Sequence, residues 1–439
     1  MKAISSVLFV LLFSCFCRVS AQTSQASAED RSLDGASSSR QERVEERQEQ
    51  KKKKKKNDKK EGARFTFADH PSFRMGTAVR LNFEARIESY ARTPTNAIGL
   101  DQSHVAFASP RFGVTGDFLD RRIEFEVSRD PSEGPGEWKD VFVNLRRSRA
   151  LELTGGRFKV PFGREMLTGR SNLDFVYRSF AAEALSPGRD VGVMAHGRLY
   201  RDHLKYQAGY FGRDGDNART TQTRGARDTV AARIVFAPFA SKSDALGSLE
   251  LGTAVALSRL DTQLGLRGVT VLGDGVFFDR VYVNGRRTRT GLEALWESGP
   301  ISLSSELAIV SDQRNGMGFE SNDLPGVKAA AWYVAGTWVM TGEKKHGRVD
   351  PKRALFQGGA GAFELAARLE GLRFDDVVGT ALRGNGDRVT TLGLNWYLNR
   401  FVRVQPNLII ESIHDPQNSP APSRQGRFIS GIVRFQFTL

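Results

Sequence analysis

Residues 73–88 read FRMGTAVRLNFEARIE, and this stretch indicates the fold of the chain. Its apolar residues stand at odd positions, and charged or polar residues stand at even positions from Arg74 to Glu88; the apolar set is Phe73, Met75, Val79, Leu81, Phe83, Ala85 and Ile87. A period of two places successive side chains on opposite faces of a β-strand. The stretch therefore predicts one continuous strand with an apolar face and a polar face.

The same alternation returns along the chain, for example over residues 123–128, 204–210, 249–257 and 363–370. Sixteen such segments can be counted, with starts at residues 73, 104, 121, 139, 151, 189, 202, 228, 247, 286, 299, 327, 359, 386, 401 and 425. An even number of strands is typical of bacterial outer-membrane barrels. We therefore expect an all-β protein, a transmembrane antiparallel β-barrel of about 16 strands.

The first 21 residues predict a signal peptide. Lys2 precedes an apolar run from Ile4 to Cys17, and small residues lead to Ala21. A lipoprotein acylated at Cys15 or Cys17 is the weaker alternative, because the residues before these cysteines suit acylation poorly. Cleavage after residue 21 would remove both cysteines, and with them disulfides, thiol nucleophiles and Cys-based metal sites. The longest later apolar run, residues 329–340, is too short for a spanning helix, which needs about 18 residues.

Residues 22–63 are rich in Ser, Gln, Glu, Arg and Lys and cannot bury a core. We expect a disordered or helical charged arm in the periplasm, followed by the barrel domain at residues 64–439. The net charge is +14, of which the first 63 residues carry +5, so the barrel itself is basic. Nucleic-acid binding is not expected, because no aromatic residues interrupt the lysine run. Contact with the cell wall remains open for that run, Lys51, Lys52, Lys53, Lys54, Lys55 and Lys56.

A soluble β protein with an apolar core is the alternative to a membrane barrel. Arg and Glu recur on the polar faces of successive segments, as a wet lumen requires. Residues 429–439 alternate up to Leu439 and resemble the C-terminal signal of outer-membrane barrels, with Leu in place of the usual Phe. Both features favour the membrane, where surrounding lipid is a further expected partner.

Three segments, GGRFKVPFGRE (155–165), NLDFVYR (172–178) and SPGRDVGV (186–193), resemble the phosphate- and polyphosphate-selective porin family, the porins of O and P type. Later segments at 340–343 (MTGE), 361–368 (GAFELAAR) and 393–399 (GLNWYLN) resemble family strands in the same order. The similarity covers roughly residues 73–439. It implies a sixteen-stranded homotrimeric porin with a constricted, arginine-lined channel for passive diffusion of phosphate, polyphosphate or other small anions.

A narrow channel can pass a partly dehydrated phosphate only if several cationic donors replace its water, and arginine matches two phosphate oxygens at once. Strand parity places five candidates in the lumen: Arg80, Arg86, Lys205, Arg233 and Arg368. Five more belong to the motif segment: Lys159, Arg164, Arg170, Arg178 and Arg189. For any single cation, an ion pair with Glu84, Glu364 or Glu370 is the alternative.

Residues 161–187 interrupt the strand rhythm and are too long for a simple turn. We expect this segment to fold into the barrel and narrow it, with Lys159, Arg164 and Arg170 facing the ion; a solvated external loop is the alternative. Ala108 and Ser109 stand where the family has adjacent arginines, and Thr168 to Ser171 replace paired hydroxyls. Anion preference is therefore a firmer expectation than phosphate preference.

Catalysis is not expected, and neither a metal nor a cofactor is. The chain has no phosphate-binding glycine loop with its lysine, no His-Glu-x-x-His pair and no Gly-x-Ser-x-Gly elbow. Its six histidines are scattered. Two other functions remain open: a structural barrel that anchors the envelope through its basic arm, and a barrel hydrolase that uses Ser, His and Asn.

Overall fold

The structure is a computed structural model. It describes residues 64–66, 72–75, 79–94, 104–107, 110–131, 137–220, 226–240, 245–272, 275–375, 384–414 and 426–438. For residues 64–107, 226, 426 and 428 it describes the backbone alone. The expected signal peptide and the arm at 22–63 lie outside the described residues. Among the residues described, no helix is long and apolar enough to cross a bilayer.

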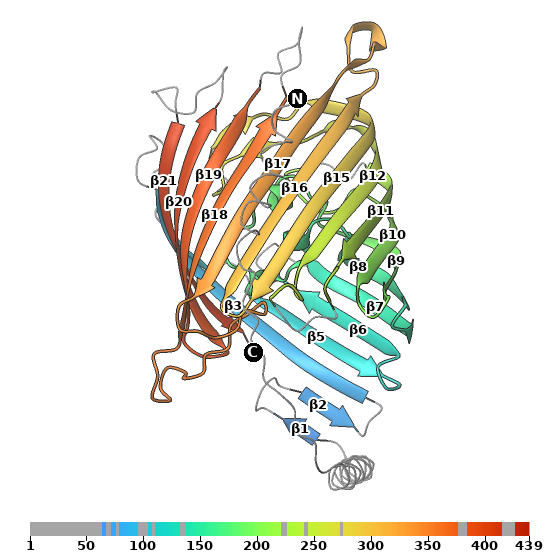
Figure 1. Cartoon of the computed structure of the whole chain (residues 1–439). Coiled ribbons are helices and arrows are strands. Elements are labelled where there is room, and N and C mark those ends of the chain that lie inside the picture. Colours follow the sequence, from blue (N-terminus) through green and yellow to red (C-terminus); the bar gives the residue numbers. More distant parts are fainter. Residues whose placement is uncertain are drawn as a thin grey trace, which may run out of the picture. The chain divides into compact units, whose positions relative to one another are not determined.

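Sixteen of the nineteen strands in the main sheet of the described chain form a closed circuit (Figure 1). They are β3 (Val79–Pro94), β5 (Arg111–Phe118), β6 (Ile123–Arg129), β7 (Trp138–Ser148), β8 (Leu151–Lys159), β9 (Arg189–Leu199), β10 (Leu204–Phe211), β11 (Ala226–Phe236), β12 (Glu250–Leu264), β15 (Tyr282–Ser298), β16 (Ile301–Arg314), β17 (Leu324–Val339), β18 (Ala362–Phe374), β19 (Gly386–Tyr397), β20 (Val402–His414) and β21 (Gly426–Thr438). Each strand pairs antiparallel with the next, and β21 pairs with β3 through Phe437 and Ile87. The predicted barrel and its strand number are confirmed.

The first predicted strand is broken in two. β2 (Ser72–Met75) pairs antiparallel with β3, with Met75 opposite Val79, so the chain reverses direction inside the stretch that the alternation read as continuous. β1 (Arg64–Thr66) pairs with β2, and β4 (His104–Phe107) pairs with the far end of β3. A period of two is preserved across a tight hairpin, which explains why the sequence pattern did not reveal the turn.

The connections define two ends of the barrel. At one, called here the turn end, short links at 119–122, 149–150, 200–203, 299–300 and 398–401 join the strands, whereas residues 237–249 and 340–361 form longer links. The opposite end, the loop end, carries the remaining connections. Two of these, residues 160–188 and 265–281, contain short elements: α3 (Arg164–Leu167), η2 (Arg170–Asn172), α4 (Phe180–Glu183), β13 (Gly268–Val269) and β14 (Val276–Phe278). A further turn, η3 (Phe319–Ser321), lies between β16 and β17.

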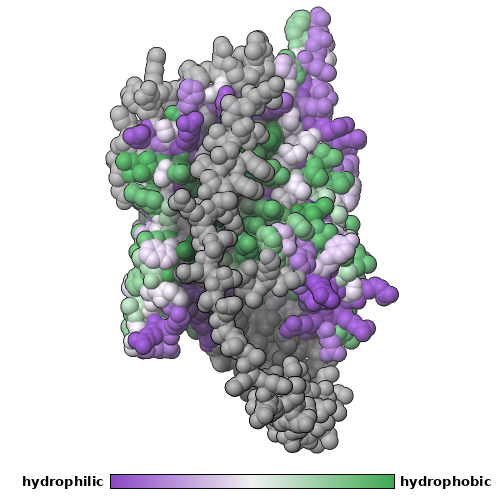
Figure 2. Space-filling model, viewed as in Figure 1, coloured by the Kyte–Doolittle hydropathy of each residue, from purple (hydrophilic) through white to green (hydrophobic). Residues whose placement is uncertain are grey.

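The outer face is apolar, as a lipid-facing wall requires. On β17, Trp332, Val334 and Trp338 point outward and remain 44–51% exposed, while Tyr333 and Ala335 between them are buried. Figure 2 shows hydrophobic residues gathered between hydrophilic zones at the two ends. The alternation of each strand is therefore set by lipid outside and by the barrel contents inside.

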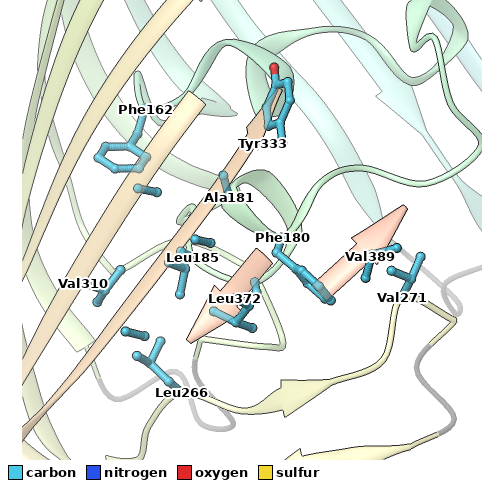
Figure 3. Close-up of a cluster of buried hydrophobic side chains, with 14 of the residues drawn as sticks. Phe162, Phe180, Ala181, Leu185, Leu266, Val271, Val310, Tyr333, Leu372 and Val389 are labelled. Carbon is cyan, nitrogen blue, oxygen red and sulfur yellow. The ribbon is translucent and has the colours of Figure 1, made fainter. Parts of the chain in front are cut away.

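The barrel also contains an apolar core inside its wall. The two connections 160–188 and 265–281 enter the barrel and form a core with inward residues of the strands (Figure 3). Phe180 and Leu185 come from the first connection, and Leu266 and Val271 from the second. The strands β12, β16, β17 and β18 contribute many small side chains to the same core: Ala254, Ala256, Ala308, Ala329, Ala331, Ala335 and Ala366. This packing explains why residues 329–340 are apolar on both strand faces.

Candidate functional site

Residues 160–188, called here the inserted loop, cross the barrel interior. They are held by inward side chains of strands between β16 and β21, which we call the far wall. The backbone N–H of Glu165 donates to Glu306 on β16 at 2.6 Å. The N–H of Val176 donates to Asn407 on β20 at 2.8 Å, and that of Phe180 to Glu370 on β18 at 2.7 Å. Buried backbone groups need such partners. Side chains of the wall therefore fix the path of the loop.

Donors on the same wall hold the loop carbonyls. Arg403 on β20 donates to the carbonyl oxygens of Leu173 and Ser171 at 2.9 and 3.0 Å. Gln405 donates to the carbonyl of Asp174 at 2.7 Å. The structure thus places the segment expected to narrow the pore inside the barrel, where side chains from strands between β16 and β21 hold it.

The inserted loop has two faces of different chemistry. Its buried side is apolar and includes Phe162, Phe175 and Phe180, each at most 2% exposed. The half-buried positions along the loop and at its two junctions include all five predicted motif cations: Lys159, Arg164, Arg170, Arg178 and Arg189. The apolar side chains of the loop thus take the most buried positions, and the cations take less buried ones.

Four cations form a group that we call the basic cluster: Arg111, Lys159, Arg178 and Arg189. Lys159 interacts electrostatically with the other three, and Asp140 on β7 lies among them. Arg189 binds Asp140 through two nitrogens at 3.0 Å each, and Arg111 contacts the same carboxylate as well as Glu126 at 3.3 Å. Arg170 lies close enough to interact with Arg178.

Lys159 and Arg178 differ from the other two members in their partners. The Nζ of Lys159 donates to the carbonyls of Leu167 and Thr168 at 3.2 and 3.0 Å, beyond the C-terminal end of α3. Arg178 donates to the carbonyl of Thr168 at 2.9 Å and also contacts that of Glu165. Among the described residues neither side chain forms an ion pair with a carboxylate. Neutral carbonyl oxygens, rather than carboxylates, therefore hold these two side chains in place.

The three described strand cations of the prediction are paired with acids. Lys205 on β10 pairs with Glu250, and Arg233 on β11 pairs with Glu293. Arg368 on β18 is 1% exposed and binds Glu370 at 2.8 Å and Glu165 at 3.1 Å. The side chains of Arg80, Arg86 and Glu84 lie outside those described, although the backbone register places Arg86 opposite Arg111.

Sequence reasoning missed several parts of this site. Arg111 lies two positions after Ser109, which with Ala108 stands where the family has adjacent arginines; both residues lie outside those described. Asp140 lies in an ordinary strand pattern and was not singled out. The second connection, residues 265–281, was not expected inside the barrel because its Val and Phe residues resemble a strand. Its Val271 N–H donates to Glu411 on β20 at 2.6 Å, so it uses the same anchoring chemistry as the inserted loop.

Residues 79–439 match the sequence model of a family described as phosphate-selective porin O and P. No curated protein matches the chain.

Solved outer-membrane proteins share the fold. OmpT of Vibrio cholerae in its trimer form has 11% identity and a TM-score of 0.55, covering 82% of this chain and all of its own. The outer membrane channel DcaP of Acinetobacter baumannii has 10% identity and a TM-score of 0.55, covering 82% and 98%. An anion-selective porin from Comamonas acidovorans has 13% identity and a TM-score of 0.53, covering 82% and 100%. At these identities the likeness concerns the fold.

Proposed function

This chain belongs to the phosphate-selective porin O and P family, and from that premise we propose that it forms a passive channel that prefers anions and passes phosphate or polyphosphate. The protein is an outer-membrane porin with a closed β-barrel. Selectivity must then come from charged groups inside the barrel rather than from the fold, because porins of one architecture differ in the ions they pass.

The observation that carries the proposal is the binding of Lys159 and Arg178 to carbonyl oxygens instead of carboxylates. An ion pair cancels most of the field of a cation a few ångströms away, whereas a neutral acceptor does not. Of the four cations in the basic cluster, Arg111 and Arg189 form ion pairs among the described residues, with Asp140 and Glu126, whereas Lys159 and Arg178 do not. An anion that loses water in the constriction can exchange it for these donors.

The acids of the far wall support the same conclusion. Glu306, Glu370 and Glu411 accept hydrogen bonds from loop backbone N–H groups, and each is at most 6% exposed. Acids engaged in this way face the loop rather than the open lumen. The wall acids therefore serve as acceptors for buried backbone groups, which supports the assignment of the anion preference to the cations of the basic cluster.

The assembly we propose is a homotrimer that meets through β7, β8 and β9. Outward residues of these strands are aliphatic and exposed, including Val143 at 45%, Leu153 at 50% and Val193 at 61%. The neighbouring β6 and β10 have 7 and 8 residues, fewer than the roughly 9–11 that a strand needs to span a bilayer. Where strands are too short to span the bilayer, a second copy of the chain covers their outer face better than lipid does.

The orientation we propose places the loop end outside the cell and the turn end in the periplasm, as in outer-membrane barrels with short periplasmic turns. Residues 1–21 would be cleaved on export, and the arm at 22–63 would lie in the periplasm, where its lysines could contact the cell wall.

Planar bilayers test the channel and its preference. Wild-type protein should give stepwise conductance, and a potassium chloride gradient should give an anion-selective reversal potential that is strongest at low salt, because screening weakens exposed charge. Lys159→Gln combined with Arg178→Gln should reduce both the anion preference and the block of chloride current by phosphate. The control is Arg149→Gln, an exposed residue of the turn end that pairs with Asp202. Equal selectivity in the double variant and the wild type would refute the assignment.

A further inference from the structure

The connection between β17 and β18, residues 340–361, reaches the inserted loop from the turn end. Its Lys345 is 3% exposed. The Nζ of Lys345 contacts Oδ1 of Asp174 in the inserted loop and lies 2.6 Å from Oε1 of Glu364 on β18. The backbone N–H of Lys345 donates to the carbonyl of Gly299 at 2.8 Å, so its main chain is held as well. One buried cation therefore joins the link, the loop and the wall.

The two acids of this triad are held from other directions. Glu364 accepts from Tyr397 at 2.8 Å and from Asn395 at 3.0 Å through its second oxygen. The main-chain carbonyl of Asp174 accepts from Gln405 and Asn395 at 2.7 and 3.1 Å. The side chain of Asp174 keeps 21% exposure, whereas Glu364 is fully buried. Asp174 is thus the member that retains access to water.

A second cation lies near Asp174. Arg164 is half-buried on the inserted loop, and its electrostatic neighbours include Asp174, Glu306 and Glu297. Within the described residues Asp174 forms its ion pair with Lys345 and none with Arg164. The carboxylate of Asp174 thus lies near two cations, one from the inserted loop and one from the link at the turn end.

We propose that Lys345 is a selectivity-determining positioning residue: by binding Asp174 it neutralises the acid and leaves Arg164 to act on the permeating anion. The inference rests on the proposed anion-preferring channel. Lys345 itself is too deeply buried to bind the ion, so its effect passes through Asp174 and Arg164. The link at 340–361 is then part of the filter, although it starts at the opposite end of the barrel from the inserted loop.

Reversal potentials of a small variant set test the proposal. Lys345→Met removes the charge at similar length and should lower the anion-to-cation permeability ratio at least about twofold at low salt, where screening is weakest. Lys345→Arg should restore it. Lys344→Met is the matched control, because Lys344 is the exposed neighbour in the same link and should change the ratio little.

The second arm measures coupling between the two residues. Asp174→Asn should raise the ratio, and in that background Lys345→Met should have a much smaller effect than in the wild type, because the acid that it would release is gone. A purely structural role would predict equal effects in both backgrounds. If Lys345→Met does not yield a folded barrel, Asp174→Asn alone decides, and a fall in the ratio would overturn the proposal.

These outcomes separate the inference from the proposed function. A wild-type channel without anion preference would contradict the proposed function, while the shift caused by Lys345→Met would still be expected. An anion-preferring wild type with the same ratio in Lys345→Met and Lys344→Met would leave the function standing and overturn the role of Lys345.

Discussion

Glu370 on β18 accepts a hydrogen bond of 2.7 Å from the backbone N–H of Phe180, two residues that are 190 positions apart in the chain. The same carboxylate binds Arg368. One wall acid therefore anchors the inserted loop and neutralises a fully buried arginine. The relationship shows how a loop without long helices keeps a defined position inside a barrel.

Replacing this acid should loosen the loop without opening the sheet. Glu370→Ala leaves the Phe180 N–H without its acceptor and Arg368 without its nearest partner, and should lower the free energy of unfolding by about 3 kcal/mol. Urea titration in detergent micelles measures this loss, and bilayer recordings should show larger current fluctuations. Glu320→Ala, on the exposed turn η3, is the control. Unchanged stability and current noise in Glu370→Ala would contradict the anchoring role.

A second prediction concerns Asp214 in the connection between β10 and β11. It is 1% exposed and binds Arg289 at 2.8 Å and Arg287 at 2.7 Å, both fully buried. Asp214→Asn would leave two buried guanidinium groups with too little negative charge. The free energy of unfolding should fall by about 3–5 kcal/mol, as is typical when one partner of a buried ion pair is removed.

Asp214 should also give stability a dependence on acid pH. Burial alone would raise the pKa of this carboxyl, but Arg289 and Arg287 hold it well below its usual range. Its contribution is therefore complete above the unfolded pKa of about 3.9 and is lost as pH falls toward the lowered folded pKa. Urea titrations between about pH 5 and pH 2 should show less loss in Asp214→Asn than in the wild type. Asp261→Asn, in an exposed pair with Arg227, should follow the wild type.

The proposed trimer face on β7, β8 and β9 can be tested by placing a larger side chain on it. Val193→Trp on β9 adds an aromatic ring that lipid accepts and a packed interface does not. Unheated electrophoresis and light scattering in detergent should show monomers. Leu369→Trp, on outward-facing β18, is 54% exposed in the wild type and should leave the trimer intact. Trimers in both variants would exclude β9 from the interface.

The charged arm gives a fourth prediction. Because residues 23–60 lack the apolar residues needed for a core, their deletion should leave barrel assembly intact. Folded outer-membrane barrels migrate differently before and after heating, and the deleted protein should keep this difference. Its loss would show that the arm takes part in assembly.

The sequence predicted much of this fold because lipid and lumen impose opposite chemistry on alternate residues. Fourteen of the sixteen predicted starts lie within about four residues of the start of a strand in the circuit, whereas the starts at 73 and 104 coincide with β2 and β4. The predicted interruption at 161–187 is where the chain turns inward. The hairpin between Met75 and Val79 was missed because it keeps the parity of the alternation.

The site was less accessible to sequence reasoning. Lys159 and Arg233 are both basic residues near the lumen, yet one binds carbonyls and the other binds Glu293. That difference depends on where α3 ends and on which strands are neighbours, and neither is encoded in local periodicity. Lys345 gave no signal at all, because its partner Asp174 is 171 positions away.

The seam between β3 and β21 joins Ile87 to Phe437, about 350 positions apart. The other neighbours in the circuit are consecutive along the chain and can pair as hairpins, but this last pair cannot form until the C-terminal strand is available. Until then the sheet has two unpaired edges, which can template association with other chains. A pairing so distant in sequence is also slow to form. A premature stop before β21 would therefore do more than remove one strand. It would leave an open sheet with two unpaired edges, and such a sheet is prone to aggregate.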